Sequence, residues 1–166
     1  WGNDVAIGMD NDPTTFGRPP FSSANIMLNC LFYQDLRACA ELALRLKRTN
    51  DHDRIQMQAE ALSAAIQKYC WDPRDAFYYT ADVMCTDQRS KWLPGIGQGM
   101  AMSWQSLPMR IQTAAGVLPL WCGLASEQQA KELVERNYRH DDRFRAAYGI
   151  RTLSKMEPMY SLTAHS

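Results

Sequence analysis

Apolar residues recur every three or four positions along two neighbouring stretches, and this spacing constrains the fold more than any other feature. A repeat near 3.6 residues predicts a helix, which would begin at a cap on Ser22 or Ser23 and end near Arg48. A second stripe runs from Ile55 to Tyr69, after a capping-box pattern at Asp53 and Gln56. Only a short turn separates the stripes, so we expect two antiparallel helices in contact. The recurring positions of the first stripe are Leu28, Phe32, Leu36, Cys39, Ala43 and Leu46.

The second half of the chain repeats this order. Residues 71–84 alternate apolar and polar side chains, which predicts a short strand or hairpin. A third long helix is expected from Ser106 to Ala125, kinked or shortened by Pro119. Ser126 and Gln129 form a second capping-box pattern before another helix. The sequence therefore predicts two helix pairs, each followed by an aromatic, non-helical stretch.

Helix pairs joined by aromatic loops are typical of an α/α toroid. The predicted fold class is all-α: a partial (α/α)6 toroid, or barrel, of antiparallel helix hairpins with short β-like loop segments. Six hairpins need twelve helices, or about 190 residues at ordinary helix and loop lengths. Four helices are expected in these 166 residues. We therefore interpret residues 1–166 as one partial domain that lacks N- and C-terminal parts of the barrel.

Composition excludes several functional classes. The chain is 46% hydrophobic with a formal net charge of zero, so it is neither disordered nor a general nucleic-acid binder. It has no apolar run long enough to cross a membrane. The five cysteines lack metal-site spacing, so we expect no metal or other cofactor and interpret them as buried thiols of a reducing, cytoplasmic compartment. Oligomeric state is not determined by the sequence.

The densest polar segment, residues 8–18, precedes the first helix. It reads Gly-Met-Asp-Asn-Asp-Pro-Thr-Thr-Phe-Gly-Arg. Asp and Asn are good turn builders, which is one interpretation. The other is a carboxylic acid on a loop beside a cleft, where it acts as a proton donor. Asn25, at the buried start of the helix that follows, also needs hydrogen-bond partners for its amide.

Residues 8–13 resemble the G-M/V-D-N-S/D-P motif of the glycoside hydrolases grouped with processing α-glucosidase, mannosylglycerate hydrolase and bacterial trehalase-like enzymes (glycoside hydrolase family 63-like). The resemblance covers nearly the whole chain, and its first and last motifs are the most specific. Further matching segments are 16–19, 22–25, 71–72, 77–79, 106–108, 110–112 and 148–154.

The resemblance implies an (α/α)6 barrel that hydrolyses glycosidic bonds, of the α-glucoside or α-mannoside type, with inversion. It makes Asp10 the general acid, and Asn11 would hold a sugar hydroxyl or orient Asp10. Asp12 would be a neighbouring carboxylate or a turn cap. The family's base, a Glu, would lie beyond the chain. Glu157 is the only late glutamate, and a structural or rim role is favoured for it over the role of base because the family places the base elsewhere. We therefore expect residues 1–166 alone to be inactive or nearly so.

Loop aromatics would form the platform for an oligosaccharide or glycoside, because flat sugar faces stack on rings. Arg18 and Arg151 lie in matched loop motifs and would bind hydroxyls or a carboxylate, although Arg18 could equally pair with Asp12. Core packing is the alternative for each of these aromatic residues. The predicted platform residues are Phe16, Trp71, Tyr78 and Trp104, and Trp1 is a further candidate.

Two other functions remain open at this stage. An α/α-barrel sugar epimerase or isomerase would use histidines as acid and base, but His52, His140 and His165 are scattered. A non-catalytic carbohydrate-binding or scaffold domain would keep the aromatics without needing Asp10.

Overall fold

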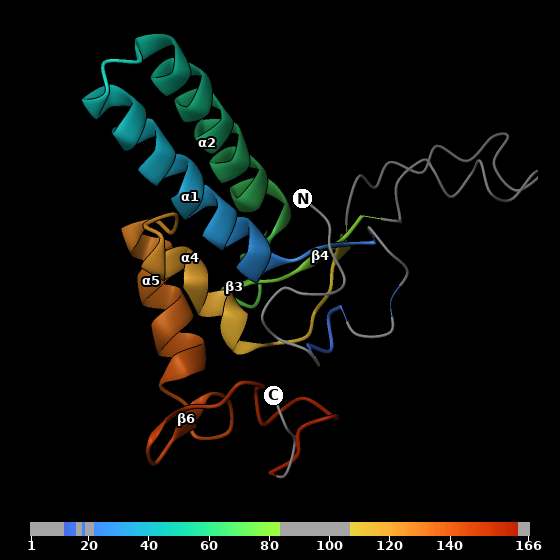
Figure 1. Ribbon diagram of the computed structural model, residues 1–166. Coiled ribbons are helices and arrows are strands. Elements are labelled where there is room, and N and C mark those ends of the chain that lie inside the picture. The colour runs from blue at the N-terminus through green and yellow to red at the C-terminus, as the bar shows by residue number, and fades with distance from the viewer. Residues whose placement is uncertain (1–11, 16–17, 19–21, 84–106, 163–166) are drawn as a thin grey trace, which may run out of the picture.

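A computed structural model describes residues 12–15, 18, 22–83 and 107–162 of the chain. Its largest feature is a hairpin of two long helices, α1 (Ile26–Arg45) and α2 (Thr49–Tyr69), which run antiparallel and project from the rest of the molecule (Figure 1). The turn between them contains Lys47 in the left-handed region, at φ 58°. The predicted helix pair is confirmed, but α2 begins at Thr49, ahead of the expected start at Asp53.

Helix α1 begins slightly later than its sequence signal suggested. Its cap is Asn25, whose Oδ1 accepts a hydrogen bond from the Leu28 N–H at 3.0 Å. Asn is as good a cap as Ser. The two serines are used differently, because Ser23 lies in an extended strand and Ser22 precedes it.

Short strands surround the base of this hairpin. We call the antiparallel sheet of β1 (Ser23–Ala24), β4 (Ala81–Asp82) and β5 (Leu107–Pro108) the strand clasp, with β4 in its centre. Strands β2 (Trp71–Asp72) and β3 (Phe77–Tyr78) form a separate antiparallel pair. The strand character expected for residues 71–84 is thus confirmed over its described part.

The long helix expected from Ser106 to Ala125 is wrong. Leu107–Pro108 pairs with β4, and the chain stays extended until the 3₁₀ turn η1 (Ala114–Val117) and the short helix α4 (Leu118–Trp121). Backbone N–H groups of this stretch bond outward: Met109 to the Thr80 carbonyl, and Ala114 to the Thr152 carbonyl. Tertiary pairing overrides the helical spacing here. Pro119 lies in the first turn of α4, where no intrahelical N–H bond is lost.

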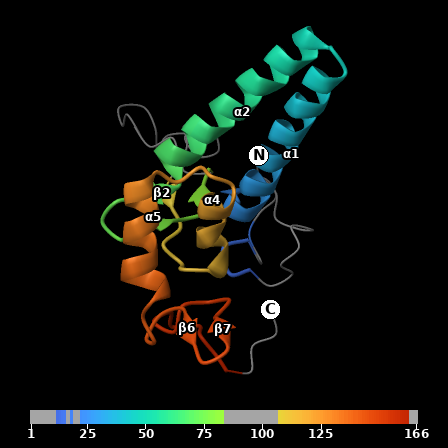
Figure 2. The ribbon, with the colours of Figure 1, turned by 90° about the vertical axis from the view of Figure 1, so that its left-hand side faces the viewer.

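The second helix pair is completed by α5 (Glu127–Leu133), which continues as a π-helical turn, η2 (Val134–Tyr138). The predicted capping box at Ser126 and Gln129 is present. Figure 2 shows α4 and α5 side by side below the α1–α2 hairpin, with β6 (Arg145–Ala146) and β7 (Gly149–Ile150) at the far end. The architecture is two helix pairs with short β segments between and after them.

The core lies where the two helix pairs meet. Phe77, Tyr138 and Phe144 stack there, with Phe77 and Phe144 nearly parallel at a centroid distance of 5.8 Å. Ile26 and Cys30 of α1 pack into the same cluster. The base of the long hairpin is thereby buried, whereas its far end carries exposed side chains, including Leu42, Leu44, Leu46 and Met57.

The thiols follow the expectation of burial with one exception. Cys30, Cys70 and Cys122 are buried, Cys39 is exposed, and Cys85 lies outside the described residues. Burial raises the pKa of the Cys70 thiol to about 12. Within the described ranges, no helix has both the length and the apolarity needed to cross a bilayer.

Candidate active site

The described part of the polar loop is a turn built around the Asp12 carboxylate. Its Oδ1 accepts hydrogen bonds from the Thr14 N–H at 2.8 Å and the Thr14 hydroxyl at 2.7 Å. The Asp12 carbonyl accepts from the Thr15 N–H at 3.0 Å. Asp12 is only 1% exposed. Of the two roles considered for this residue, the turn cap is the one that the geometry supports.

Longer-range bonds attach this turn to the fold. Asp12 Oδ2 accepts from Asn25 Nδ2 at 3.3 Å, so one side chain both caps α1 and holds the loop. The Thr14 and Thr80 hydroxyls are hydrogen-bonded to each other at 3.3 Å, and the Thr80 oxygen also accepts from the Ile26 N–H. The sequence indicates that a buried Asn25 needs hydrogen-bond partners, but nothing in it points to Thr80.

Arg18 fixes the other end of the loop. It forms an ion pair with Asp82 of β4 at 2.7 Å, and its Nε donates to the Ser23 hydroxyl at 3.2 Å. Pairing with Asp12, one of the expectations, is therefore wrong. The Arg18 side chain as a whole remains 27% exposed. Arg18 thus joins the loop to the strand clasp while it retains surface for a further contact.

Two of the predicted aromatic residues lie together in the β2–β3 pair. The Trp71 and Tyr78 rings are 4.7 Å apart, and Trp71 is half-buried. Tyr78 is fully buried, and its hydroxyl bonds to Gln67 and Gln129. Burial raises its pKa to about 12. A ring without exposed surface offers no face to a sugar in this structure, so the core alternative fits Tyr78.

Of the remaining predicted residues, Arg151 is the one that the described part of the chain contains. Arg151 donates to the carbonyls of Arg143 and Arg145, and these bonds close the β6–β7 segment. Asp10, Asn11, Phe16 and Trp104 lie outside the described residues. Among the residues that are described, no group of three His, Cys, Asp or Glu side chains could hold a metal ion.

A second polar network, which the sequence did not indicate, lies beside the β2–β3 turn. Asp72 is bound by Arg74, and Asp75 accepts from Arg110 and from the Tyr79 hydroxyl at 2.7 Å. Hydrogen bonds from Arg74 lower the pKa of Asp72. Burial would raise the pKa of Asp75, but its bonds to Arg110 and Tyr79 hold it below its usual range. Asp72 and Asp75 are therefore both engaged in ion pairs that hold the β2–β3 turn to its neighbours, and neither carboxylate of this network is left unpaired to act as an acid.

Glu157 belongs to a neighbouring structural network. Its Oε1 accepts from the Gln112 N–H at 2.8 Å, and Gln112 Nε2 donates to Asn137 at 3.2 Å. Asn137, which is fully buried, also donates to the Ala76 carbonyl. This position supports the structural interpretation of Glu157.

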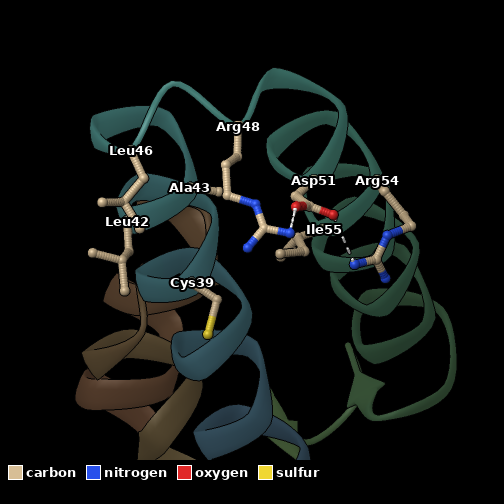
Figure 3. A pocket seen from close by; sticks show the side chains of 8 residues that line it. All are labelled: Cys39, Leu42, Ala43, Leu46, Arg48, Asp51, Arg54 and Ile55. Carbon is tan, nitrogen blue, oxygen red and sulfur yellow. Dashed lines mark hydrogen bonds and ion pairs between the residues drawn. The ribbon is translucent and has the colours of Figure 1, made fainter.

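A surface hollow lies far from the polar loop, at the tip of the α1–α2 hairpin (Figure 3). Its charged residues are paired with one another, because Asp51 pairs with both Arg48 and Arg54. Two guanidinium groups share one carboxylate, so the hollow carries a net charge of +1. The residues around the hollow are Cys39, Leu42, Ala43, Leu46, Arg48, Asp51, Arg54 and Ile55.

The described residues form paired helices, with a carboxylate-bearing loop fixed at the start of one of them. The chain belongs to the family of the mannosylglycerate hydrolase MGH1-like glycoside hydrolase domain, which matches residues 3–165. No individually curated protein matches it.

Solved structures share the fold at low sequence identity. A sialidase is 18% identical, with a TM-score of 0.73 over 95% of this chain and 12% of its own. A GH63 mannosylglycerate hydrolase from Thermus thermophilus, in complex with glucose, is 19% identical, with a TM-score of 0.63 over 87% of this chain and 30% of its own. The neutral trehalase of Saccharomyces cerevisiae is also 19% identical, with a TM-score of 0.59 over 82% of this chain and 22% of its own.

The chain thus spans less than a third of the length of these three proteins. The helix pairs fit the all-α class, and the arrangement is part of an (α/α)6 toroid.

Proposed function

We propose that this chain is one part of an inverting glycosidase and that it carries the general acid, Asp10. The supporting observation is the fixed turn at Asp12–Thr15, which begins two residues after Asp10 in a chain of a glycoside hydrolase family. The substrate is proposed to be an oligosaccharide or other glycoside of the α-glucoside or α-mannoside type. Residues 1–166 would form a single partial catalytic domain.

The chemistry needs two carboxyl groups with different tasks. Asp10 gives its proton to the leaving-group oxygen while a second carboxylate activates water on the opposite face of the sugar. An acid that works near neutral pH needs a raised pKa, through burial or a nearby negative charge. Glu157 is engaged by the Gln112 backbone, so we place the base on a glutamate outside residues 1–166.

Substrate contacts are proposed for residues on the connecting loops. Asn11 would bind a sugar hydroxyl or orient Asp10, and Phe16, Trp71 and Trp104 would supply ring faces. Arg18 has exposed surface for hydroxyl groups or a carboxylate. Arg151 is proposed for the same task, although its bonds to two carbonyls restrict it. Tyr78 would contribute only from beneath, through its contact with Trp71.

Replacement of Asp10 tests the acid directly through the leaving group. In the protein at its full natural length, we expect Asp10→Asn to lose most hydrolysis of methyl α-glucoside or methyl α-mannoside, by roughly 10²- to 10⁴-fold. The matching α-glycosyl fluoride should be hydrolysed at a nearly unchanged rate, because fluoride departs without protonation. The control is Asp141→Asn, which alters an exposed carboxylate and should change neither rate.

The outcomes separate the three functions. Wild-type hydrolysis with an inverted anomeric product, followed by a selective loss in Asp10→Asn, supports the proposal. Equal rates on the methyl glycosides in wild type and Asp10→Asn would refute the acid assignment. Sugar interconversion without hydrolysis would favour the epimerase or isomerase, and glycan binding without any turnover would favour a binding domain.

A further inference from the structure

We propose that Asp12 is a positioning residue for the general acid: its buried carboxylate fixes the turn that follows Asp10 in the chain to the start of α1. This inference rests on the proposed function and deepens it, because it assigns the second carboxylate of the loop to placement instead of proton transfer. It also names Asn25 as the partner through which that placement reaches the fold.

The Asp12 carboxylate uses both oxygens. Oδ1 takes two hydrogen bonds from Thr14, and Oδ2 takes one from Asn25. At 1% exposure the group is shielded from water, and no cation among the described residues pairs with it. A buried charge without a counter-charge is costly unless neutral donors surround it. The buried position of the Asp12 carboxylate therefore depends on the donors of Thr14 and Asn25, which fix its place in the fold.

The anchors lie outside the loop itself. Asn25 is the N-cap of α1, and Thr80, which bonds to Thr14, lies between β3 and β4. Both are nearly inaccessible to solvent, so the turn is fixed to the buried base of the molecule. Asp10 is joined to Asp12 by two residues of chain, which span at most about 7 Å, so a displacement of Asp12 would be passed on to the proposed acid. An acid misplaced by about 1 Å loses on the order of 10² in rate.

A second turn in the same chain provides a matched comparison. Asp72 is followed by a proline, as Asp12 is, and its Oδ1 accepts from the Arg74 N–H at 2.9 Å. It is also buried, at 3% exposure. Unlike Asp12, it has a cation partner in Arg74, and it belongs to the β2–β3 turn. The two aspartates share local geometry and burial, but Asp12 belongs to the polar loop that precedes α1 and Asp72 to the β2–β3 turn.

The test is Asp12→Asn in the full-length protein. The new amide keeps the oxygen that faces Thr14 but places an NH₂ group against Asn25 Nδ2, so two donors face each other. Asn25 cannot turn its amide to help, because its Oδ1 caps α1. We expect hydrolysis of the methyl α-glycoside to fall about tenfold or more in kcat. KM and the rate on the α-glycosyl fluoride should change little.

The rescue is an exchange variant that combines Asp12→Asn with Asn25→Asp. The amide introduced at position 12 would then donate to the carboxylate introduced at position 25. That carboxylate can still cap α1, because aspartate is as good a cap as asparagine. The pair is restored with donor and acceptor reversed and with net charge unchanged, so we expect the methyl glycoside rate to return most of the way. Asn25→Asp alone, which sets two carboxylates against each other, should be as impaired as Asp12→Asn.

Stability measurements separate placement from folding. Asp72→Asn should lower the melting temperature by an amount similar to Asp12→Asn, yet leave the ratio of methyl glycoside to fluoride rates unchanged. If Asp12→Asn reduces both rates equally, or leaves both unchanged, the positioning role is wrong. If Asp10→Asn shows the leaving-group signature and Asp12→Asn does not, only this inference fails. If neither shows it, the proposed function fails as well.

Discussion

Gly116, in the 3₁₀ turn η1, lies against the aromatic core with almost no space beside it. An added Cβ would come within 2.4 Å of Phe77 Cζ and 2.9 Å of the Tyr78 carbonyl oxygen. Because Phe77 is itself packed against Phe144 and Tyr138, its ring has nowhere to move. We expect Gly116→Ala to lower the free energy of unfolding by about 1–3 kcal/mol, measured by urea denaturation.

Gly123 provides the control for that variant. It follows α4 with φ +70°, and nothing lies within 4 Å of an added Cβ. Asn tolerates this left-handed conformation better than other side chains. Gly123→Asn should therefore change stability by less than Gly116→Ala. A Gly116→Ala protein as stable as wild type would contradict the close packing of η1 on Phe77.

At the same scale, the sequence identifies residue types better than it identifies their surroundings. The polar loop and the buried Asn25 could be predicted, because charged and amide groups beside a buried helix start need hydrogen-bond partners. Tyr78 was expected at a platform on the basis of an aromatic loop pattern. That ring is buried, and its hydroxyl bonds to Gln67 and Gln129 on two other helices, so the local pattern could not distinguish a core position from a platform position.

Helix α5 is attached to the long hairpin through its own capping box. Gln129 Oε1 accepts from the Ser126 N–H at 2.9 Å and from the Tyr78 hydroxyl, while its Nε2 donates to Gln67 of α2 at 2.8 Å. Ser126 makes only the cap. We expect Ser126→Ala to cost about 1 kcal/mol in unfolding free energy. Gln129→Ala should cost more, because buried partners also lose bonds.

Thermal or denaturant unfolding of both variants checks this order. Gln129→Glu would keep an acceptor for Ser126 and Tyr78 but lose the donor to Gln67, so it should fall between wild type and Gln129→Ala. Equal effects of Ser126→Ala and Gln129→Ala would mean that the contacts to α2 contribute nothing.

The elements show where local signals are sufficient. The α1–α2 hairpin and the start of α5 follow from periodicity and caps, both of which act over a few residues. The stretch from Leu107 to Thr113 does not, because its N–H groups bond to Thr80 and Glu157, far away in the chain. The apolar residues of that stretch are spaced as in a helix, but they pack on other elements and the chain is extended there.

Across the whole molecule, the ion pairs around Asp72 and Asp75 make stability depend on pH. The pKa of Asp72 is lowered in the fold, first by its hydrogen bond from Arg74. A carboxyl of this kind stabilises the fold above its ordinary pKa near 4, and the contribution is lost as the pH falls through the lowered value. The protein should therefore lose stability steeply in acid below about pH 4.

Asp72→Asn tests this dependence. The variant should melt at a lower temperature than wild type at pH 7, and the difference should shrink as the pH falls below about 4. Asp141→Asn, which removes an exposed carboxylate, should keep the wild-type profile. A constant difference between Asp72→Asn and wild type at all pH values would exclude a titrating role for Asp72.

The strand clasp also has a consequence for the order of folding. Helices α1 and α2 meet across a turn of three residues, so their pairing closes a very short loop. The clasp joins residues 24 and 81, on either side of that entire hairpin, and its closure therefore costs more chain entropy. Asp12 and Thr14 dock only on groups that the clasp brings together. Local opening of the clasp would thus release the turn at Asp12–Thr15 while the helices stay folded, so we expect this turn to form after the hairpin and to be lost before it.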